Sequence, residues 1–211
     1  MSDVDEKTEL VPDEEADGGR PTREVPPPDP EALARRREAL KLVKQFGDPV
    51  LKTKARAIED FDDELRLEVQ RMGSLMEDSM GIGLAAPQLG VPTRLLVYRL
   101  SSEAPLAALV NPEIEWSSKE TEVFEEGCLS LPAVVVDVER PVHVRVRALD
   151  EWGEEQIIEA SGLEARVIQH EMDHLDGVLI LDRTTRAQRK EAMRALREAQ
   201  ERGVRGPDLG D

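Results

Sequence analysis

Two histidines four residues apart are the part of the sequence with the clearest chemistry. His170 and His174 lie within residues 169–177, and the chain contains three histidines in all. On a helix, this spacing places both imidazoles on one face, one turn apart, where they can bind one transition-metal ion. Glu171 lies between them and could act on a metal-bound water. The pattern predicts a catalytic metal site, although such sites usually have a third protein ligand.

The residues around the histidines favour a helix. Ser161 and Glu164 have the spacing of a capping box at a helix N-terminus. Leu163 and Val167 continue the stripe that carries the histidines, and Gly177 follows where the chain must leave the helix. The histidines could instead be ordinary residues on a partly polar helix face. Metal binding is favoured because the four-residue spacing and an acidic neighbour occur together.

Cys128 is the only cysteine in the chain and is a candidate for the third ligand or for a nucleophile. It follows Gly127, which permits a tight backbone and leaves the thiol reachable. A free cysteine is commonly a small buried hydrophobic residue, but a thiolate is also a strong ligand for zinc or ferrous iron. A single cysteine excludes an intrachain disulfide and fits a reducing compartment. The third histidine, His143, alternates with apolar residues in a predicted strand and should face solvent, so we exclude it as a ligand.

Residues 81–90 form a second unusual segment, with three glycines and two alanines in ten positions. So little side-chain bulk lets a ligand or another backbone approach closely. Gln88 adds an amide that could donate a hydrogen bond to a polarised carbonyl. The glycine spacing matches neither a phosphate-binding loop nor a dinucleotide-binding fingerprint. A simple tight turn between a helix and a strand would have a similar composition.

Composition limits the class of protein that can carry this chemistry. The 211 residues have a formal net charge of −17, which argues against nucleic-acid binding by the whole surface. The chain contains no run of about eighteen apolar residues that could cross a membrane. Its acidic N-terminus lacks the apolar core of a secretory signal. We therefore expect a soluble, cytoplasmic protein that binds neither membranes nor specific nucleic-acid sequences.

The chain should consist of one domain with tails. Residues 1–30 are acidic and proline-rich, and we expect them to be disordered because they cannot bury enough apolar surface. Residues 31–203 should form a single domain, followed by a short tail over residues 204–211. Within the domain, the patterns predict helices over 31–45, 62–79 and 184–201 and strands over 94–100, 107–111, 142–149 and 155–159.

The last predicted helix carries an unusual local charge. Residues 183–205 contain eight basic and three acidic residues, a net charge of +5. A basic helix can bind an anionic partner even on an acidic protein. A solvated amphipathic helix would have the same composition, and the sequence favours neither interpretation.

Three segments, taken together and in this order, resemble the motifs of the peptide deformylases, which remove the N-formyl group from nascent bacterial proteins. The segments read Gly-x-Gly-x-Ala-Ala-x-Gln at 81–88, Glu-Gly-Cys-x-Ser at 126–130 and Gln-His-Glu-x-x-His at 169–174. The resemblance extends from about Phe46 to the C-terminal helix. It implies an α+β fold with antiparallel and mixed sheets packed around a central metal-binding helix, one helix before it and one helix after it.

The resemblance implies a metal centre and a proton-transferring residue. Cys128, His170 and His174 would bind one divalent metal ion per chain, which is ferrous iron in most of the family; zinc, nickel or cobalt would suit the same ligands. Glu171 would take a proton from the attacking water and deliver one to the leaving amine. The substrates would be N-formylmethionyl nascent peptides, and the basic C-terminal helix would be compatible with docking to the ribosome.

The resemblance also implies the contacts to the substrate. The Gln88 side chain and the Leu129 backbone N–H would stabilise the oxyanion of the tetrahedral intermediate. Gly83 would allow the substrate backbone to approach. The pocket for the methionine side chain should have its wall near Ile82, Glu126 and Val167. Asp173 could pair with Arg140 and steady the metal-binding helix.

The sequence departs from the family pattern at residues 133–136, where Ala-Val-Val-Val replaces a segment like Gly-x-Arg-Gly. Contacts to the peptide beyond its first residue are therefore not implied. Two other functions remain compatible with the chain. A zinc peptidase would take its third ligand downstream of the helix, where no histidine or cysteine follows, so Cys128 favours the deformylase. A non-catalytic homologue that binds metal or formylated peptides would keep the same residues.

Overall fold

The computed structural model describes residues 29–206. The disorder predicted for the N-terminal tail falls almost entirely on residues outside that range, as does most of the predicted C-terminal tail. The described helices are α1 (Pro30–Leu40), α2 (Asp63–Asp78), α3 (Gly162–Leu175), α4 (Ile180–Arg183) and α5 (Arg186–Glu201), with two 3-10 turns, η1 (Pro49–Lys52) and η2 (Ala86–Leu89). The described strands are β1 (Gly83–Ala85), β2 (Leu95–Tyr98), β3 (Ala107–Ser117), β4 (Thr121–Cys128), β5 (Leu131–Pro141), β6 (His143–Leu149) and β7 (Glu155–Ser161).

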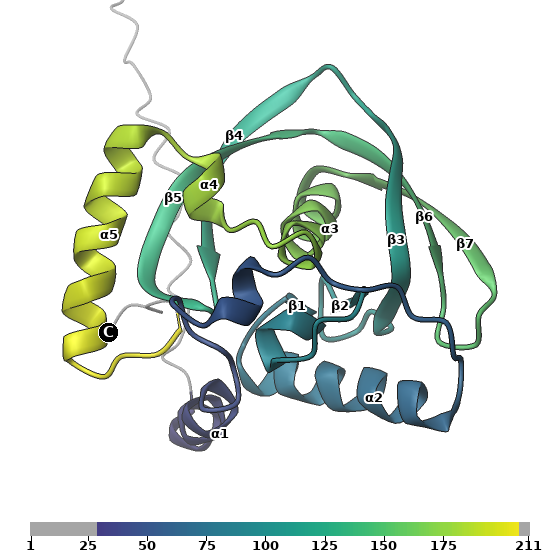
Figure 1. Ribbon diagram of the computed structural model, residues 1–211, viewed down its shortest axis with the longest axis horizontal. Helices are drawn as coiled ribbons and strands as arrows, with labels where there is room; N and C mark the ends of the chain where they lie inside the picture. The colour runs from purple at the N-terminus through teal and green to yellow at the C-terminus, as the bar shows by residue number, and fades with distance from the viewer. Residues whose placement is uncertain (1–28, 207–211) are drawn as a thin grey trace, which may run out of the picture.

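The strands form two antiparallel sheets around α3, which confirms the predicted α+β class (Figure 1). One sheet has the strand order β1-β2-β3-β6-β7, and the other is the β4–β5 hairpin. Helix α3 packs on one face of the larger sheet and α2 covers the opposite face. Alternate residues of β2 show this division, since Leu96 belongs to the core beneath α3 whereas Leu95 and Val97 belong to the core beneath α2. The site residues therefore rest on a helix that is enclosed by sheet.

Helix α2 forms where the sequence predicted it. Its N-cap residue, Asp62, accepts a hydrogen bond from the Leu65 N–H at 3.0 Å, which satisfies a free donor of the first turn. Leu65, Val69, Met72 and Met76 recur at helical spacing and are all buried. The methionines are thus core residues.

Helix α3 is also present, but the predicted capping box is wrong. Ser161 is the N-cap residue and makes no side-chain capping bond. Its hydroxyl lies 2.8 Å from His143 Nδ1, and Glu164 accepts a hydrogen bond from the Tyr98 hydroxyl at 2.9 Å. Both side chains are therefore engaged by neighbouring strands instead of by the helix terminus. The helix ends at Leu175, and Gly177 follows two residues later with a φ of +70°, the left-handed conformation expected of a glycine just beyond a helix C-terminus.

The structure contains more strands than the sequence indicated, and β3 and β7 extend further than predicted. Strand β6 has the predicted alternation, with Val144, Val146 and Ala148 buried. Strand β3 continues past Pro112, where a register shift in the pairing with β6 accommodates a residue without an N–H donor. Strand β5 was not predicted at all, although it forms half of the hairpin beside the metal-binding helix.

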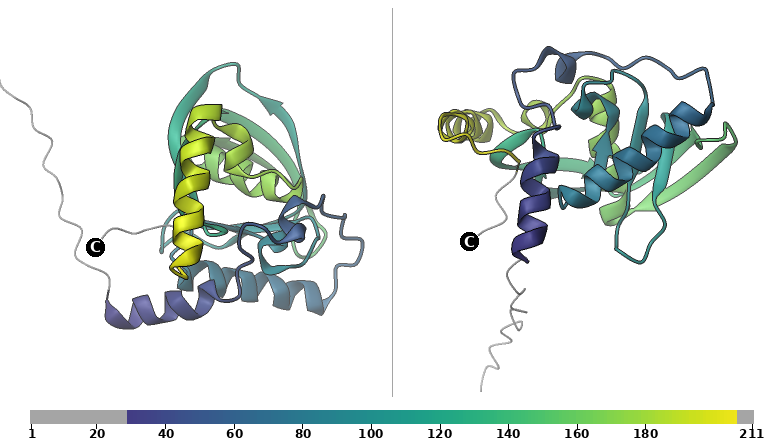
Figure 2. Two further views of the ribbon diagram at one scale, coloured as in Figure 1. Left: turned by 60° about the vertical axis from the view of Figure 1, so that its left-hand side comes forward. Right: turned by 90° about the horizontal axis from the view of Figure 1, so that it is seen from below.

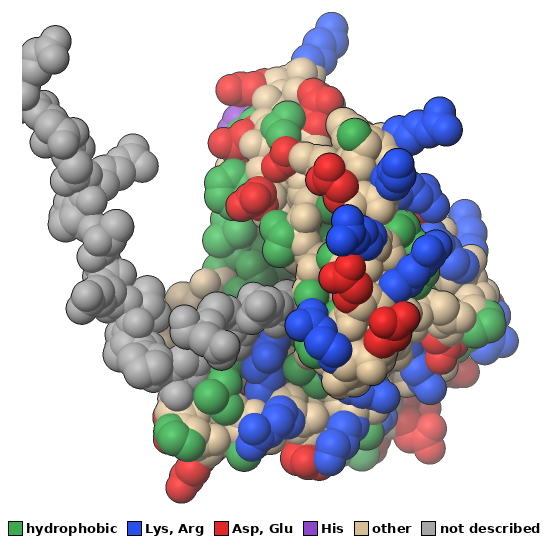
Figure 3. Space-filling model, turned by 90° about the vertical axis from the view of Figure 1, so that its left-hand side faces the viewer, with side chains coloured by type: hydrophobic (Ala, Val, Ile, Leu, Met, Phe, Trp, Pro, Cys, Tyr) green, Lys and Arg blue, Asp and Glu red, His purple; other side chains and the backbone are tan. Residues whose placement is uncertain are grey.

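Helix α5 packs on the outside of the β4–β5 hairpin (Figures 1 and 2). It buries Ala192, Leu196 and Ala199 and joins a core that includes Val136 and Val138 of β5. Its outer surface carries Lys and Arg side chains interspersed with acidic ones (Figure 3). None of the helices in residues 29–206 is long and apolar enough to span a bilayer.

Candidate active site and metal centre

The fold brings the three predicted metal ligands together. Cys128 is the last residue of β4, while His170 and His174 lie on successive turns of α3. One ligand atom from each residue lies within 4.8 Å of the others, and Cys128 Sγ is 3.3 Å from His174 Nε2. Cys128 and His174 are only 4% and 1% exposed. A thiolate and two imidazoles in a buried cluster form a ligand set for a divalent transition metal, so the residues fit the implied ion.

Hydrogen bonding prepares His170 to act as a ligand. Its Nδ1 lies 2.9 Å from Glu126 Oε2, and because a carboxylate only accepts, Nδ1 carries the proton and Nε2 is left for an ion. Burial acts to lower the pKa of His170, but the contacts with Cys128 and Glu126 outweigh it and hold this pKa well above its usual value. Burial and the charge of His170 hold the pKa of His174 well below its usual value. The residues around His170 and His174 thus favour a single positive charge there. A bound metal cation would also supply positive charge at this position.

Glu126 is the centre of a buried ionic network behind His170. Its carboxylate accepts hydrogen bonds from Arg140 Nε at 2.6 Å and Arg166 Nη1 at 2.8 Å as well as from His170. Arg140 also donates to Asp173 at 2.9 Å, which is the pairing the sequence suggested. Burial acts to raise the pKa of Glu126, but the bonds from Arg140 and His170 outweigh it and lower that pKa below its usual range. Glu126 lines the cavity, and its carboxylate also orients His170.

Glu171 directly follows His170 on α3 and faces the cluster formed by the three predicted metal ligands. Burial, opposed by the charge of His170, raises the pKa of Glu171 to about 7. Its Oε2 atom is buried and has no hydrogen-bond partner in the part of the chain that the structure describes. Gly83 of β1 approaches this side chain so closely that a Cβ atom there would lie 2.5 Å from Glu171 Oε1. The glycine therefore leaves room for the Glu171 carboxylate.

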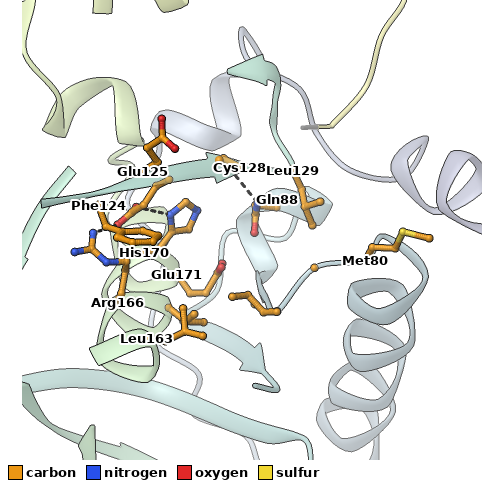
Figure 4. A pocket seen from close by; sticks show the side chains of 16 residues that line it. Met80, Gln88, Phe124, Glu125, Cys128, Leu129, Leu163, Arg166, His170 and Glu171 are labelled. Carbon is orange, nitrogen blue, oxygen red and sulfur yellow. Dashed lines mark hydrogen bonds and ion pairs between the residues drawn. The ribbon is translucent and has the colours of Figure 1, made fainter. Parts of the chain in front are cut away.

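The Gln88 amide is held in one orientation. Its Oε1 accepts a hydrogen bond from the Ala85 N–H at 2.8 Å, and its Nε2 lies 3.3 Å from Ser130 Oγ and 3.7 Å from Cys128 Sγ. The NH₂ group therefore points towards the ligand cluster. Figure 4 shows Gln88, Cys128 and Glu171 arranged around one space, with Leu129 at its edge. The side chain can act as a donor there without reorganising.

A cavity of about 340 Å³ joins these groups. It is lined by nine of the ten predicted site residues: Ile82, Gly83, Gln88, Glu126, Cys128, Leu129, Val167, His170 and Glu171. The tenth, His174, is buried beside Cys128. Seven further residues line it, and among them Phe124, Leu163 and Arg166 were not assigned to the site by the sequence interpretation. Their spacing carried a signal, because Arg166 lies one turn before His170 and Phe124 shares a strand face with Glu126.

Comparison with known proteins gives a consistent result. Residues 40–190 match the model of the polypeptide deformylase family. The chain is 45% identical over 162 residues to a peptide deformylase of Acidothermus cellulolyticus, covering 77% of this chain and 88% of that protein. It is 50% identical over 141 residues to a peptide deformylase of Picosynechococcus, covering 65% and 75%. The crystal structure of a Synechococcus elongatus peptide deformylase in complex with actinonin superimposes with a TM-score of 0.70 at 46% identity, covering 73% of this chain and 84% of that one.

Proposed function

This chain belongs to the polypeptide deformylase family, and from that premise we propose how its own residues carry out the reaction. It is a metal-dependent hydrolase that removes the N-terminal formyl group from the formyl-methionine of newly synthesised proteins and releases formate. The observation that carries the residue roles is that Cys128, His170 and His174 cluster together beside a cavity that Glu171 also lines.

We propose that Cys128, His170 and His174 bind one divalent ion, and that the native ion is ferrous iron. Zinc, nickel and cobalt suit the same ligands. When bound, the ion supplies Lewis acidity, which polarises the formyl carbonyl and lowers the pKa of water. The hydrogen bond from His170 Nδ1 to Glu126 supports this assignment, because it leaves Nε2 free to bind the ion.

Glu171 would act as the general base and then as the general acid. Its carboxylate takes a proton from the attacking water and later delivers one to the nitrogen of the leaving amine. The buried position, the free Oε2 atom and a pKa of about 7 support this role. Positioned proton transfer of this kind contributes roughly 10²- to 10⁴-fold to the rate.

Gln88 and Leu129 would stabilise the developing negative charge on the formyl oxygen. Gln88 Nε2 already points towards the ligand cluster. Leu129 follows Cys128 directly, and no hydrogen bond from its N–H to another described residue is found. Donors that are fixed before the reaction lower the barrier because they need not reorganise as charge develops. Collapse of the intermediate then gives formate and a free N-terminal amine.

The methionine side chain would occupy the apolar part of the cavity. Ile82 and Val167, which the family resemblance implied, line the cavity, and Phe124 and Leu163 extend the apolar surface towards solvent. Gly83 would allow the peptide backbone to lie beside β1. This surface supports an apolar first side chain and a peptide that continues out of the cavity.

We further propose that the enzyme acts in the cytoplasm on N-formylmethionyl nascent peptides and docks to the ribosome through the outer face of α5. The support is that α5 buries an apolar stripe against the domain and leaves its basic residues exposed. An anionic partner such as ribosomal RNA would be attracted to that face.

Formate release from a short formyl-methionyl peptide tests the metal centre. We expect one metal per chain and release of formate from the ferrous wild-type protein purified without oxygen. Cys128→Ser should lose both, because a hydroxyl is a poor ligand compared with a thiolate. Full activity and metal content in Cys128→Ser would contradict the proposed ligand set and would instead favour a histidine-based peptidase site.

A further inference from the structure

Residues 43–46, which we term the strap, connect to both segments that provide oxyanion donors. The Lys44 N–H donates to the Gln88 backbone carbonyl at 2.7 Å. The Phe46 N–H donates to the Ser130 carbonyl at 2.9 Å. Between them, the Gln45 side chain donates through Nε2 to the Leu129 carbonyl at 3.2 Å. Three successive residues therefore contact the two segments that the reaction requires to be held in place.

The Gln45 side chain is itself fixed in one orientation. Its Nε2 atom also donates to the Val43 carbonyl at 3.1 Å, so both amide hydrogens are directed at carbonyl oxygens. Its Oε1 atom is buried and has no partner among the described residues. A buried acceptor without a partner costs free energy. The two hydrogen bonds that Nε2 donates must offset this cost, so they fix the orientation of the side chain.

The strap is anchored on both of its sides. Val43 is buried in the core that contains Met72 and Leu129. On the outer side, Gln200 of α5 donates through Nε2 to the Phe46 carbonyl at 3.1 Å. The strap is thus held between the core and the C-terminal helix, and it cannot shift without breaking one of these contacts.

We propose that Gln45 is a positioning residue for deformylation, because it orients the peptide unit that follows Leu129. Cys128 holds the turn from one side as a metal ligand, and Gln45 holds it from the other side through the Leu129 carbonyl. Together these two anchors set the direction of the Leu129 N–H. The proposal rests on the oxyanion role proposed above for Leu129 and Gln88.

Gln45→Met tests the proposal, because methionine has a similar length but donates no hydrogen bond. A displacement of the donor weakens an interaction that is strongest in the transition state, so kcat and kcat/KM should fall together by about tenfold. KM should stay within about twofold of the wild-type value. Metal content should remain one ion per chain, since the ligands are untouched. Gln70→Met on the exposed face of α2 is the matched control and should leave all values unchanged.

Gln45→Glu provides a second variant that keeps the size and polarity of the side chain. A carboxylate places acceptors against the Leu129 and Val43 carbonyls, so kcat should fall at least as far as in Gln45→Met. The proposal is overturned if kcat is unchanged in both variants, or if only KM rises. It is also overturned if activity falls only in proportion to lost metal or to lost thermal stability, which would indicate a purely structural role.

Gln88→Ala separates this proposal from the one on which it rests. If Gln88→Ala lowers kcat while both Gln45 variants match the wild type, the positioning role of Gln45 is wrong and the oxyanion assignment stands. If Gln88→Ala also has wild-type kcat, the oxyanion assignment itself has failed.

Discussion

At the scale of single residues, the functional side chains are held in place by hydrogen bonds to a further layer of residues behind them. His170 presents Nε2 to the ligand cluster because Glu126 fixes its Nδ1. Glu126 can remain a buried anion because Arg140 and Arg166 donate to it. The orientation of each functional group therefore depends on the residue that hydrogen-bonds to it from outside the site.

Replacing Glu126 with glutamine should weaken metal binding. The amide keeps the volume but removes the charge that faces two buried guanidinium groups and His170. Loss of such a supporting partner typically lowers metal affinity by about 10- to 100-fold. Competition with a chelator measures the change, and Glu125→Gln, at the neighbouring position on the cavity wall, is the control. A metal dissociation constant equal to that of the wild type would contradict this account of His170.

Gly83→Ala should separate catalysis from metal binding. The new Cβ would lie 2.5 Å from Glu171 Oε1, so the carboxylate must move away from its position beside the ligands. A displacement of about 1 Å can cost about 10²-fold, and we expect kcat to fall at least tenfold. Metal analysis should still find one ion per chain. An unchanged kcat would show that the position of Glu171 observed here is not the one used in the reaction.

At the scale of secondary structure, periodicity predicted the elements whose buried faces are apolar. Helix α2 and strand β6 follow their patterns closely. Strand β5 escaped prediction because its buried face includes Arg140, whereas Val135 on the opposite face is 52% exposed. The burial of Arg140 depends on carboxylates from β4 and α3, which no local pattern reveals. The capping box at Ser161 failed for the same reason, since a distant strand supplied a competing partner.

Gly177 should be required to end the metal-binding helix. Its φ of +70° strains any other residue, and a Cβ would lie 2.8 Å from the backbone carbon of Lys52. The strain alone costs about 1–2 kcal/mol, so Gly177→Ala should lower the unfolding free energy by more than this amount. Gly162→Ala, at the other end of α3, is the control, because its φ is +56° and no atom lies within 4 Å of the added carbon. Equal losses in both variants of the unfolding free energy, measured with denaturant, would contradict the predicted clash.

At the scale of the whole molecule, the functional residues come from segments that lie far apart in the sequence. Cys128 and His174 are separated by 46 positions in the sequence. The ordered motifs connected these residues through a family resemblance, whereas spacing alone proposed only the histidine pair. The Glu126–Arg140–Arg166 network and the strap at Gln45 could not be predicted, because they consist of long-range contacts between polar residues. Such contacts leave no periodic signal in the sequence.

The basic face of α5 should bind the ribosome independently of catalysis. Arg186, Lys190 and Arg197 project from the same side of the helix and are exposed. Reversing all three to glutamate should weaken co-sedimentation with ribosomes by about tenfold or more, since electrostatic contacts with RNA add up. Hydrolysis of a short formyl peptide should be unaffected. Charge reversal is a sharper test than deletion of α5, because deletion would uncover Val136 and Val138 of β5, which lie in the same core as Leu196.

Arg71→Glu on α2 is the control for an exposed charge reversal elsewhere. It should leave co-sedimentation with ribosomes unchanged. If the triple variant also sediments like the wild type at low salt, the basic face of α5 is only a solvated surface.

Formate release by Glu171→Gln tests the central claim most directly. The amide keeps the size of the side chain but cannot carry the proton, so release should fall by roughly 10²- to 10⁴-fold. Metal analysis of the same sample should find one ferrous ion per chain, because Cys128, His170 and His174 are intact. That combination would establish Glu171 as the proton-transferring residue beside the metal centre. Wild-type release by Glu171→Gln with metal bound would contradict it.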